Sequence, residues 1–333
     1  MDLDTAWKHL FGLPIVVEHL LRGFVTPVAS RLDFGSLQEL SASWSGPDRE
    51  QRHGDAAWRV NYSDGTGRSL VLLLEFQSSV DQSMAVRVQR YKVMAYEALS
   101  RQRRFDACGQ LRLLPVVIHS GNQIWNAPGG AKEIKLGRDG EILLPLAFSY
   151  LSLDVQRLAQ QDLPSRNLVA TVFELDTLAS PAGIPGHIRD LSAWLPGVVD
   201  AAAVNVVLTT IVDWLAAVTP RMFPGSGAAH RMVAKMQQEV RERENTMSLL
   251  AERAKQWEAD WLQQGIERGV KRGLAAEREL LCHMAERKFN AGTAAALAGQ
   301  IATVTDTDRL TEVGGWIIDC ETDTELLAKT GKL

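Results

Sequence analysis

The chain has 333 residues, of which 46% are hydrophobic and 23% are charged, and this is the composition of a globular protein with one large domain or two. The formal net charge of -4 argues against a wholly basic protein that coats DNA. It leaves room for a local basic patch, so the distribution of charge along the chain matters more than its sum.

Cysteine usage and hydropathy indicate a soluble cytoplasmic protein without a membrane partner. The three cysteines are odd in number, widely spaced and free of any Cys-x-x-Cys pattern, as expected of reduced thiols. The acidic N-terminus lacks the basic and apolar segments of a secretory signal. The most apolar stretch, 201–218, contains Asn205, Thr209, Thr210 and Asp213, so a buried core helix is expected there rather than a membrane span.

The first predicted element is a helix over about 5–24, with Asp4 as its cap. Apolar residues recur close to helical spacing along it, namely Trp7, Leu10, Phe11, Val17 and Leu21. Glu18 lies within this helix and could add an acid to a functional site, but an exposed helix edge is the preferred explanation.

Residues 55–77 predict a β-hairpin whose second strand is buried. The first strand is rich in aromatic and β-branched residues, the turn at 63–67 contains Asp64-Gly65 and a second glycine, and 71–77 is apolar until Glu75 interrupts it. Asp64 competes with Asp55 as an acidic ligand, but its Asp-Gly context favours a role in the turn.

The hairpin predicts two acids and an amide on one face. Side chains alternate along a strand, so Glu75 and Gln77 share a face. With a turn centred near Thr66, Asp55 pairs with about Gln77 and joins that face, whereas a slip of one residue places it on the opposite face. A carboxylate at the end of a buried strand is costly unless it is paired or binds a metal. Asp55 and Glu75 are therefore candidate ligands of a divalent cation that prefers oxygen; the alternative is an ion pair of Glu75 with Arg87 or Arg90.

A helix over about 83–101 and a strand over 111–119 follow the hairpin. Arg87 and Tyr91 are four residues apart and share a helix face, from which both can reach a phosphate, and Arg90 is a weaker candidate. The segment 82–112 holds seven basic residues against two acidic ones, the strongest basic concentration in the chain.

Two groups near this segment have competing explanations. For Arg101, Arg103 and Arg104, a solvated helix end and contact with DNA explain the charges equally well. His53 and His119 can each approach the hairpin, but a lone histidine near a strand end more often has a structural hydrogen-bonding role.

The remainder of the chain is predicted to be mostly helical. Strand or loop is expected over 143–153 and 173–175, and helices over 187–194 and 199–218, with a domain boundary at 219–227. Further along, apolar residues spaced by three and four form a coiled-coil-like seam, Met247, Leu250, Ala254, Trp257 and Trp261. Three glycines follow at intervals of four and indicate close packing or a hinge, Gly265, Gly269 and Gly273. The predicted organisation is a domain over 1–222, a charged helical connector over 228–275 and a small helical domain over 276–333.

The segment 53–91 resembles the recombination-promoting nuclease/putative transposase family, a branch of the PD-(D/E)xK endonuclease-like superfamily. The motif reads here as Asp55, Glu75-Phe76-Gln77-Ser78, Asp81, Met84 and Arg87 with Tyr91. The start, Asp4-x-x-Trp7-Lys8-x-x-Phe11-x-x-Pro14, and the segment 114–121 also fit the family. The similarity covers roughly 1–220, while 265–328 resembles a small domain of unknown function often attached to such proteins.

The resemblance implies an α/β (α+β) fold with a central mixed sheet flanked by helices, extended by an all-helical C-terminal part. It implies a metal-dependent DNA endonuclease that promotes recombination, in which Asp55 and Glu75 hold Mg²⁺ (or Mn²⁺) and Gln77 orients the attacking water. Arg87, Arg90 and Tyr91 would contact nucleic acid. Most members of the superfamily carry a lysine where this chain has Gln77, and an amide cannot carry that charge.

Two other interpretations stay open from the sequence. One is a catalytically silent nucleic-acid-binding or oligomeric scaffold protein, in which the acids serve an ion-pair network. The other is an oligomerisation module whose function lies in residues 230–330. A homo-oligomer, in the first place a dimer formed through the C-terminal helices, is expected in either case and would suit cutting of both DNA strands.

Overall fold

The computed structural model describes residues 2–41, 43–45, 51–53, 55–101, 112–132, 135–136, 142–143, 150–241 and 247–332. Its contacts divide the chain into two compact units, Met1–Trp257 and Glu258–Leu333. The sequence predicted three segments instead. The predicted connector over 228–275 is shared between the two units, because its first helix packs into the core of the first unit through Ala229, Val233, Met236 and Val240.

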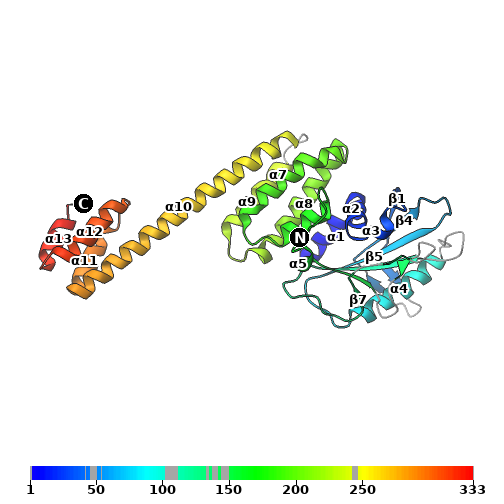
Figure 1. Cartoon of the computed structure of the whole chain (residues 1–333), viewed down its shortest axis with the longest axis horizontal. Coiled ribbons are helices and arrows are strands. Elements are labelled where there is room, and N and C mark those ends of the chain that lie inside the picture. Colours follow the sequence, from blue (N-terminus) through cyan, green and yellow to red (C-terminus); the bar gives the residue numbers. More distant parts are fainter. Residues whose placement is uncertain are drawn as a thin grey trace. The chain divides into compact units, whose positions relative to one another are not determined.

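The first unit is built on a mixed sheet, six-stranded among the described residues, in the order β1-β4-β5-β6-β10-β7 (Figure 1). Strand β4 runs antiparallel to both of its neighbours, β1 and β5, whereas β5, β6, β10 and β7 are parallel. Their bounds are β1 Leu32–Leu40, β4 Ala56–Tyr62, β5 Ser69–Gln77, β6 Arg112–His119, β7 Gly130–Ala131 and β10 Tyr150–Asp154. Two short ribbons accompany the sheet, formed by β2 (Ser43–Ser45) with β3 (Gln51–His53) and by β8 (Lys135–Leu136) with β9 (Ile142–Leu143).

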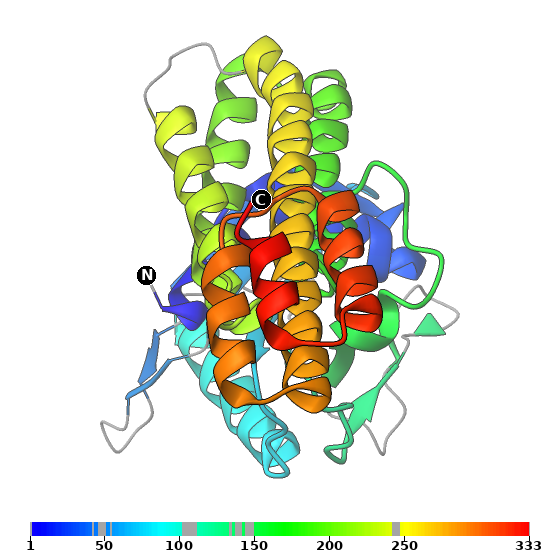
Figure 2. The ribbon, with the colours of Figure 1, turned by 90° about the vertical axis from the view of Figure 1, so that its left-hand side faces the viewer.

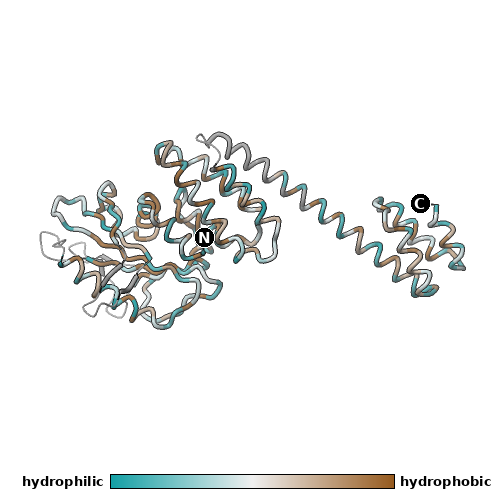
Figure 3. Tube along the Cα trace, turned by 180° about the vertical axis from the view of Figure 1, so that it is seen from behind, coloured by the Kyte–Doolittle hydropathy of each residue, from teal (hydrophilic) through white to brown (hydrophobic). Residues whose placement is uncertain are grey.

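Helices cover both faces of this sheet, which confirms the predicted α/β class. The helices of the first unit are α1 Leu3–Phe11, α2 Pro14–Phe24, α3 Thr26–Ala29, α4 Met84–Arg101, α5 Val155–Leu158, α6 Leu168–Asp176, α7 Ile184–Trp194, α8 Ala201–Met222 and α9 Gly227–Arg241, with 3-10 turns η1 Pro181–Gly183 and η2 Leu195–Gly197. Alternation along β5 directs Leu70, Leu72, Leu74 and Phe76 into the main core with α1, α2, α6 and α8. The opposite face packs against α4 (Figure 1), and Figure 3 shows the hydrophobic colour along these strands.

The predicted first helix is two helices. The chain breaks between Phe11 and Pro14, because a proline inside a helix lacks the N–H donor and clashes with the preceding turn. The cap is Asp2 rather than Asp4, since the Asp2 carboxylate accepts a hydrogen bond from the Thr5 amide at 2.8 Å. Glu18 pairs with Arg22 at 2.7 Å on the edge of α2, as the preferred explanation had it.

Two further expectations for the first unit are wrong. Residues 173–175 belong to α6, which Asn167 caps and which is buried almost all round, so its sequence lacks the polar face that marks a helix. Thr219-Pro220 does not end α8, which continues to Met222; the Thr219 hydroxyl donates to the Leu215 carbonyl at 2.6 Å. The predicted helices over 83–101, 187–194 and 199–218 are confirmed within a few residues.

Helix α8 is long and apolar enough to cross a membrane by length and composition alone. In this structure it packs against α1 and α9, and its side chains Val207, Leu208, Ile211 and Leu215 are buried in the main core. It is therefore a core helix, as the sequence predicted.

The second unit is all helical, as predicted. The division between the units falls within α10 (Met247–Lys288), whose later turns pack with α11 (Ala291–Ile301), α12 (Thr307–Asp319) and α13 (Asp323–Thr330) in a small bundle (Figure 2). The helix is continuous through Gly265, Gly269 and Gly273, all of them exposed. The side chains of the predicted seam at 247–261 and of His53 lie outside the described residues, and so do Arg103 and Arg104 of the basic segment as a whole.

Candidate active site

The hairpin of β4 and β5 brings Asp55 and Glu75 together. The paired residues run from Asn61 with Ser69 to Ala56 with Leu74, so the next pair in register is Asp55 with Glu75. Asp55 lies just beyond the last paired residues, and its amide donates to the carbonyl of Leu74, the partner of Ala56, at 3.3 Å. The sequence predicted Gln77 as the partner of Asp55, and this register is wrong by two residues. A shift of two preserves the face, so the predicted meeting of the two acids is retained.

The turn explains the shift. Tyr62 donates to the Arg68 carbonyl at 2.9 Å, which centres the loop on Gly65 rather than on Thr66. Gly65 and Gly67 have φ of 71° and 72°, which glycine adopts without strain. Asp64 accepts from the Thr66 amide at 3.0 Å and pairs with Arg68, so it is a turn residue, nine residues along the hairpin from Asp55 and eleven from Glu75.

Glu75 is the most perturbed acid of this region. It is buried, with 4% of its surface exposed, on the face of β5 that α4 covers. Its Oε2 lies 3.4 Å from Nη2 of Arg87, while its Oε1 is buried without a hydrogen-bond partner. Burial raises the pKa of Glu75 to about 8; the negative charge of Asp55 acts in the same direction and Arg87 opposes both. Without a cation, this shift favours the protonated form of Glu75, whose proton can bridge to Asp55 and satisfy the unpaired oxygen.

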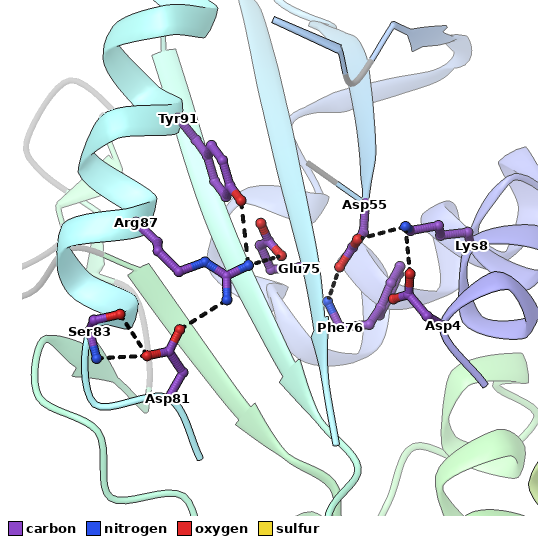
Figure 4. Close-up of polar contacts among 9 residues, drawn as sticks. All are labelled: Asp4, Lys8, Asp55, Glu75, Phe76, Asp81, Ser83, Arg87 and Tyr91. Carbon is purple, nitrogen blue, oxygen red and sulfur yellow. Dashed lines mark hydrogen bonds and ion pairs between the residues drawn. The ribbon is translucent and has the colours of Figure 1, made fainter. Parts of the chain in front are cut away.

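Asp55 is held by two donors at the start of β4. Its Oδ2 accepts a hydrogen bond from the Phe76 amide at 2.7 Å, and its Oδ1 lies 3.0 Å from Nζ of Lys8 on α1. Figure 4 shows Asp55 standing between Glu75 on one side and Lys8 on the other. The two acids thus lie side by side at the end of a buried strand, each with a cationic side chain on its outer flank.

Lys8 is a member of the site to which the sequence assigned no role. It bridges Asp55 and Asp4, whose Oδ2 lies 2.6 Å from Nζ. Burial alone would lower the pKa of Lys8, but its hydrogen bonds to Asp4 and Asp55 outweigh this effect and raise the pKa, so the ammonium stays charged. The signal in the sequence was the spacing of Asp4 and Lys8 by four residues, which places both on one helix face.

Arg87 and Tyr91 project from α4 over the acids, as their spacing predicted. Arg87 Nη1 lies 2.9 Å from Oδ2 of Asp81, and its Nη2 lies 3.4 Å from the Tyr91 hydroxyl (Figure 4). Asp81 also accepts from the Ser83 amide and hydroxyl at the start of the helix, which lowers its pKa. Arg87 therefore orients Glu75 from a fixed position. Arg90 is exposed and forms no ion pair with Asp55, Glu75 or Asp81.

Gln77 lies two residues after Glu75, on the same face of β5. Its carbonyl accepts from the Ser120 amide at 2.9 Å and lies 3.1 Å from Nδ1 of His119. The half-buried residue borders a cleft of about 270 Å³ that is lined by Asp2, Leu3, Asp4, Trp7, Phe76, Gln77, Ser78 and Ser120. His119 is buried between the carbonyls of Gln77 and Gln123, which confirms its structural role.

Two carboxylates are available for a metal ion. Within the described residues, no group of three or more acidic, histidine or cysteine side chains could hold one. Mg²⁺ is commonly bound through one or two carboxylates and keeps several waters, so this donor set fits it. The buried, unpaired Oε1 of Glu75 beside a second acid fits it as well, since a divalent cation offsets both charges and satisfies that oxygen.

Comparison with known proteins gave one match. Residues 4–179 match the family described as "Putative transposase, YhgA-like". The comparisons with curated proteins and with solved structures gave no match. The matched segment contains every residue of the acid pair and its cationic neighbours and ends before α8, and it confirms the resemblance to the recombination-promoting nuclease group. Because the match covers more than half of the 333 residues, the chain belongs to the family of YhgA-like putative transposases.

Proposed function

We propose that the protein is a metal-dependent DNA endonuclease, in which Asp55 and Glu75 bind Mg²⁺ or Mn²⁺. The observation that carries the proposal is the pairing of Asp55 with a buried Glu75 whose Oε1 has no partner and whose pKa burial raises to about 8. Two adjacent acids at the end of a buried strand are expensive for a fold to keep. A cation that binds both acids offsets their negative charges, which explains why the fold keeps them together.

The reaction is hydrolysis of a phosphodiester bond. A water oxygen bonds to phosphorus, the bond from phosphorus to one sugar oxygen breaks, and the proton lost by the water reaches that leaving oxygen through solvent. A divalent cation, when bound, supplies positive charge for the phosphate and the incoming oxygen. The chain's own residues fix the acids: Arg87 holds Glu75, and the Phe76 amide holds Asp55. Gln77 would orient the water through its amide, which both donates and accepts hydrogen bonds.

DNA as substrate is supported by membership of the transposase family and by the cations near the acids. Arg87, Arg90 and Tyr91 on α4 are the proposed contacts to the phosphate backbone. Of these three residues, Arg90 is the most accessible to a ligand, because its side chain is exposed and takes no part in the acid network. Contacts of this kind give affinity but no sequence preference.

Self-association through the C-terminal helices is part of the proposal. Helix α10 exposes Leu262, Ile266 and Val270 at intervals of four, with more than half of each side chain accessible. A dimer would bring two acid pairs to the two strands of a duplex. Light scattering on the full chain tests this: Ile266→Glu should reduce the mass to that of a monomer, and an unchanged dimer would exclude this face of α10.

A second function is supported by specific contacts. Both acids already have cationic partners, Lys8 for Asp55 and Arg87 for Glu75, so the site could serve as an ion-pair network in a nucleic-acid-binding or scaffold protein without catalysis. The two functions predict different results for the same substitution.

Nicking of supercoiled plasmid by metal-stripped protein, with Mg²⁺ or Mn²⁺ restored, distinguishes them. Glu75→Gln and Asp55→Asn should each reduce nicking by at least about 100-fold. Glu18→Gln on α2 is the matched control, because it makes the same change in a carboxylate that only pairs with Arg22, and it should cleave at the wild-type rate. Nicking that persists in folded Glu75→Gln protein, or in the presence of EDTA, would refute the proposed nuclease function. DNA binding without cleavage in the wild type would favour the scaffold.

A further inference from the structure

The ammonium group of Lys8 is built into the acid pair from a different element of the fold. Lys8 lies 47 positions before Asp55, yet Nζ is 3.0 Å from Oδ1 of Asp55 and 2.6 Å from Oδ2 of Asp4. About a third of the side chain is exposed, so the group is accessible from solvent while both acids hold it in place (Figure 4).

Packing fixes the helix that carries Lys8. The neighbouring Trp7 is 1% exposed and stacks on Phe76 at 5.8 Å between ring centroids, and Phe11 meets the same ring at 5.1 Å. Trp58 of β4 donates from Nε1 to the Phe11 carbonyl at 3.0 Å. Helix α1 is thereby attached to both strands of the hairpin, so the position of Lys8 relative to the acids is set by buried aromatic contacts rather than by a surface ion pair.

The two acids of the site lie between two cations. Lys8 flanks Asp55, Asp55 lies beside Glu75, and Arg87 flanks Glu75. Arg87 is also committed to Asp81, which leaves Lys8 as the cation that serves the Asp55 side of the pair. Gln77, at the strand position two residues after the glutamate, contributes no charge.

We propose that Lys8 is a positioning residue of this site and supplies the fixed positive charge that Gln77 does not carry. It holds Oδ1 of Asp55 while the Phe76 amide holds Oδ2, so the carboxylate presents its remaining lone pairs toward Glu75. Asp4 holds Lys8 in turn. The inference rests on the proposed nuclease function, but its test includes a measurement that does not need cleavage.

The test compares Lys8→Met, Lys8→Arg and the double variant Lys8→Met with Gln77→Lys. Substitution of a residue that orients a metal ligand typically costs 10- to 100-fold in activity or metal affinity. Lys8→Met should therefore nick plasmid about 10- to 100-fold more slowly, with little change in DNA affinity measured in Ca²⁺. Lys8→Arg should recover most of the rate, and Gln77→Lys should rescue Lys8→Met because it returns a cation to the same face as Glu75.

Lys329→Met is the matched control. Lys329 also pairs with an acid four residues earlier on its helix, Glu325 at 3.7 Å, but it lies in α13 of the second unit. It should leave the nicking rate unchanged. A Lys8→Met protein that folds and cleaves like the control, or a Lys8→Arg protein no better than Lys8→Met, would overturn the proposal.

Mn²⁺ affinity, measured by calorimetry on the full chain, separates this inference from the nuclease itself. Positioning of Asp55 predicts about 10-fold weaker Mn²⁺ binding in Lys8→Met and recovery in Lys8→Arg. Tighter binding in Lys8→Met would show that the ammonium competes with the metal, and would overturn the inference. A wild type that binds Mn²⁺ but never cleaves DNA would refute the nuclease and leave the role of Lys8 decided by these affinities. Asp4→Asn, which loosens Lys8 without removing it, should give a smaller effect of the same sign if Lys8→Met fails to fold.

Discussion

Two buried carboxylates in the first unit have opposite surroundings. Asp176, at the end of α6, has no exposed side-chain surface and faces a single guanidinium, that of Arg221 on α8, which also donates to the Ser120 carbonyl. Glu75, at the end of β5, faces a second acid as well as Arg87, which it shares with Asp81. Burial raises the pKa of both, that of Asp176 to about 6 and that of Glu75 to about 8.

Under the proposed function, this difference distinguishes an acid that stabilises the fold from an acid that binds a cation. Asp176 has its counter-charge in direct contact, and Arg221 opposes the effect of burial. Glu75 has a like charge beside it, so part of its environment adds to the effect of burial. Oδ2 of Asp176, like Oε1 of Glu75, is buried without a hydrogen-bond partner, so the two acids differ in the charges beside them and not in this respect. A dedicated guanidinium offsets the charge of a buried acid within the chain, whereas the charge of a pair of acids is offset by a proton or by a cation.

The largest effect should come from removing the guanidinium of the structural pair. Arg221→Leu leaves Asp176 buried without a counter-charge, which typically costs about 3–5 kcal/mol at pH 7.5. At pH 5 the cost should be clearly smaller, because the pKa of Asp176 lies above its ordinary value and rises further once Arg221 is gone, so the carboxyl takes up a proton. Urea unfolding at both pH values measures the change. Equal costs at pH 5 and 7.5 would show that Asp176 is not the group responsible.

A metal ion should stabilise the protein only through the acid pair of Asp55 and Glu75. At 100 times its dissociation constant, Mn²⁺ should add about 2.7 kcal/mol to the free energy of unfolding of the wild type. Glu75→Gln should lose nearly all of this gain, while Asp176→Asn, although less stable at the outset, should keep it. Thermal unfolding with and without Mn²⁺ gives the values. A similar gain in Glu75→Gln would place the cation elsewhere.

The smallest expected effect is an increase in the free energy of unfolding when the carboxylic acid of Glu75 is replaced by an amide. The pKa of Glu75 is raised from 4.5 to about 8 in the folded chain, so the folded state holds a proton that the unfolded state has lost. The contribution of this proton to the free energy of unfolding is therefore fully present below about pH 4.5 and is lost as the pH rises toward 8. In EDTA at pH 8, Glu75→Gln should exceed the wild type by at least about 1 kcal/mol, or about 2–4 °C in Tm.

This advantage should shrink at pH 5, where the wild-type acid is protonated. Asp176→Asn serves as the control and should show no gain at pH 8, since it gives up its contact with Arg221. If Glu75→Gln were less stable than the wild type at pH 8 in EDTA, Glu75 would be a structural acid like Asp176.

The site could be predicted from the sequence where it depends on local geometry. Alternation along β5 put Glu75 and Gln77 on one face, and the Asp-Gly turn at 64–65 brought Asp55 to the same end of the hairpin. The exact partner was missed because Gly65 and Gly67 both accept positive φ, so the sequence does not say which of them centres the turn. Helix α4 and its Arg87 followed from spacing alone.

Residues that reach the site over long distances could not be predicted in this way. Lys8 acquires its role from the docking of α1 against β5, and Asp176 meets Arg221 across 45 positions through the packing of α6 on α8. Strand β1 was missed because its residues are mostly polar or half-buried at the sheet edge. Residues 173–175 were placed in a strand because a helix buried on all sides shows no alternation of polar and apolar faces.

The exposed turn of the hairpin offers a site for labelling. Gly65 is ten residues from Glu75, which corresponds to about 33 Å along an extended strand at roughly 3.3 Å per residue. Nothing lies within 4 Å of the place where a side chain on Gly67 would begin. A fluorophore or short tag inserted between Asp64 and Arg68 would thus ride on the same two strands as the acids while staying far from them, and could report DNA capture without entering the chemistry.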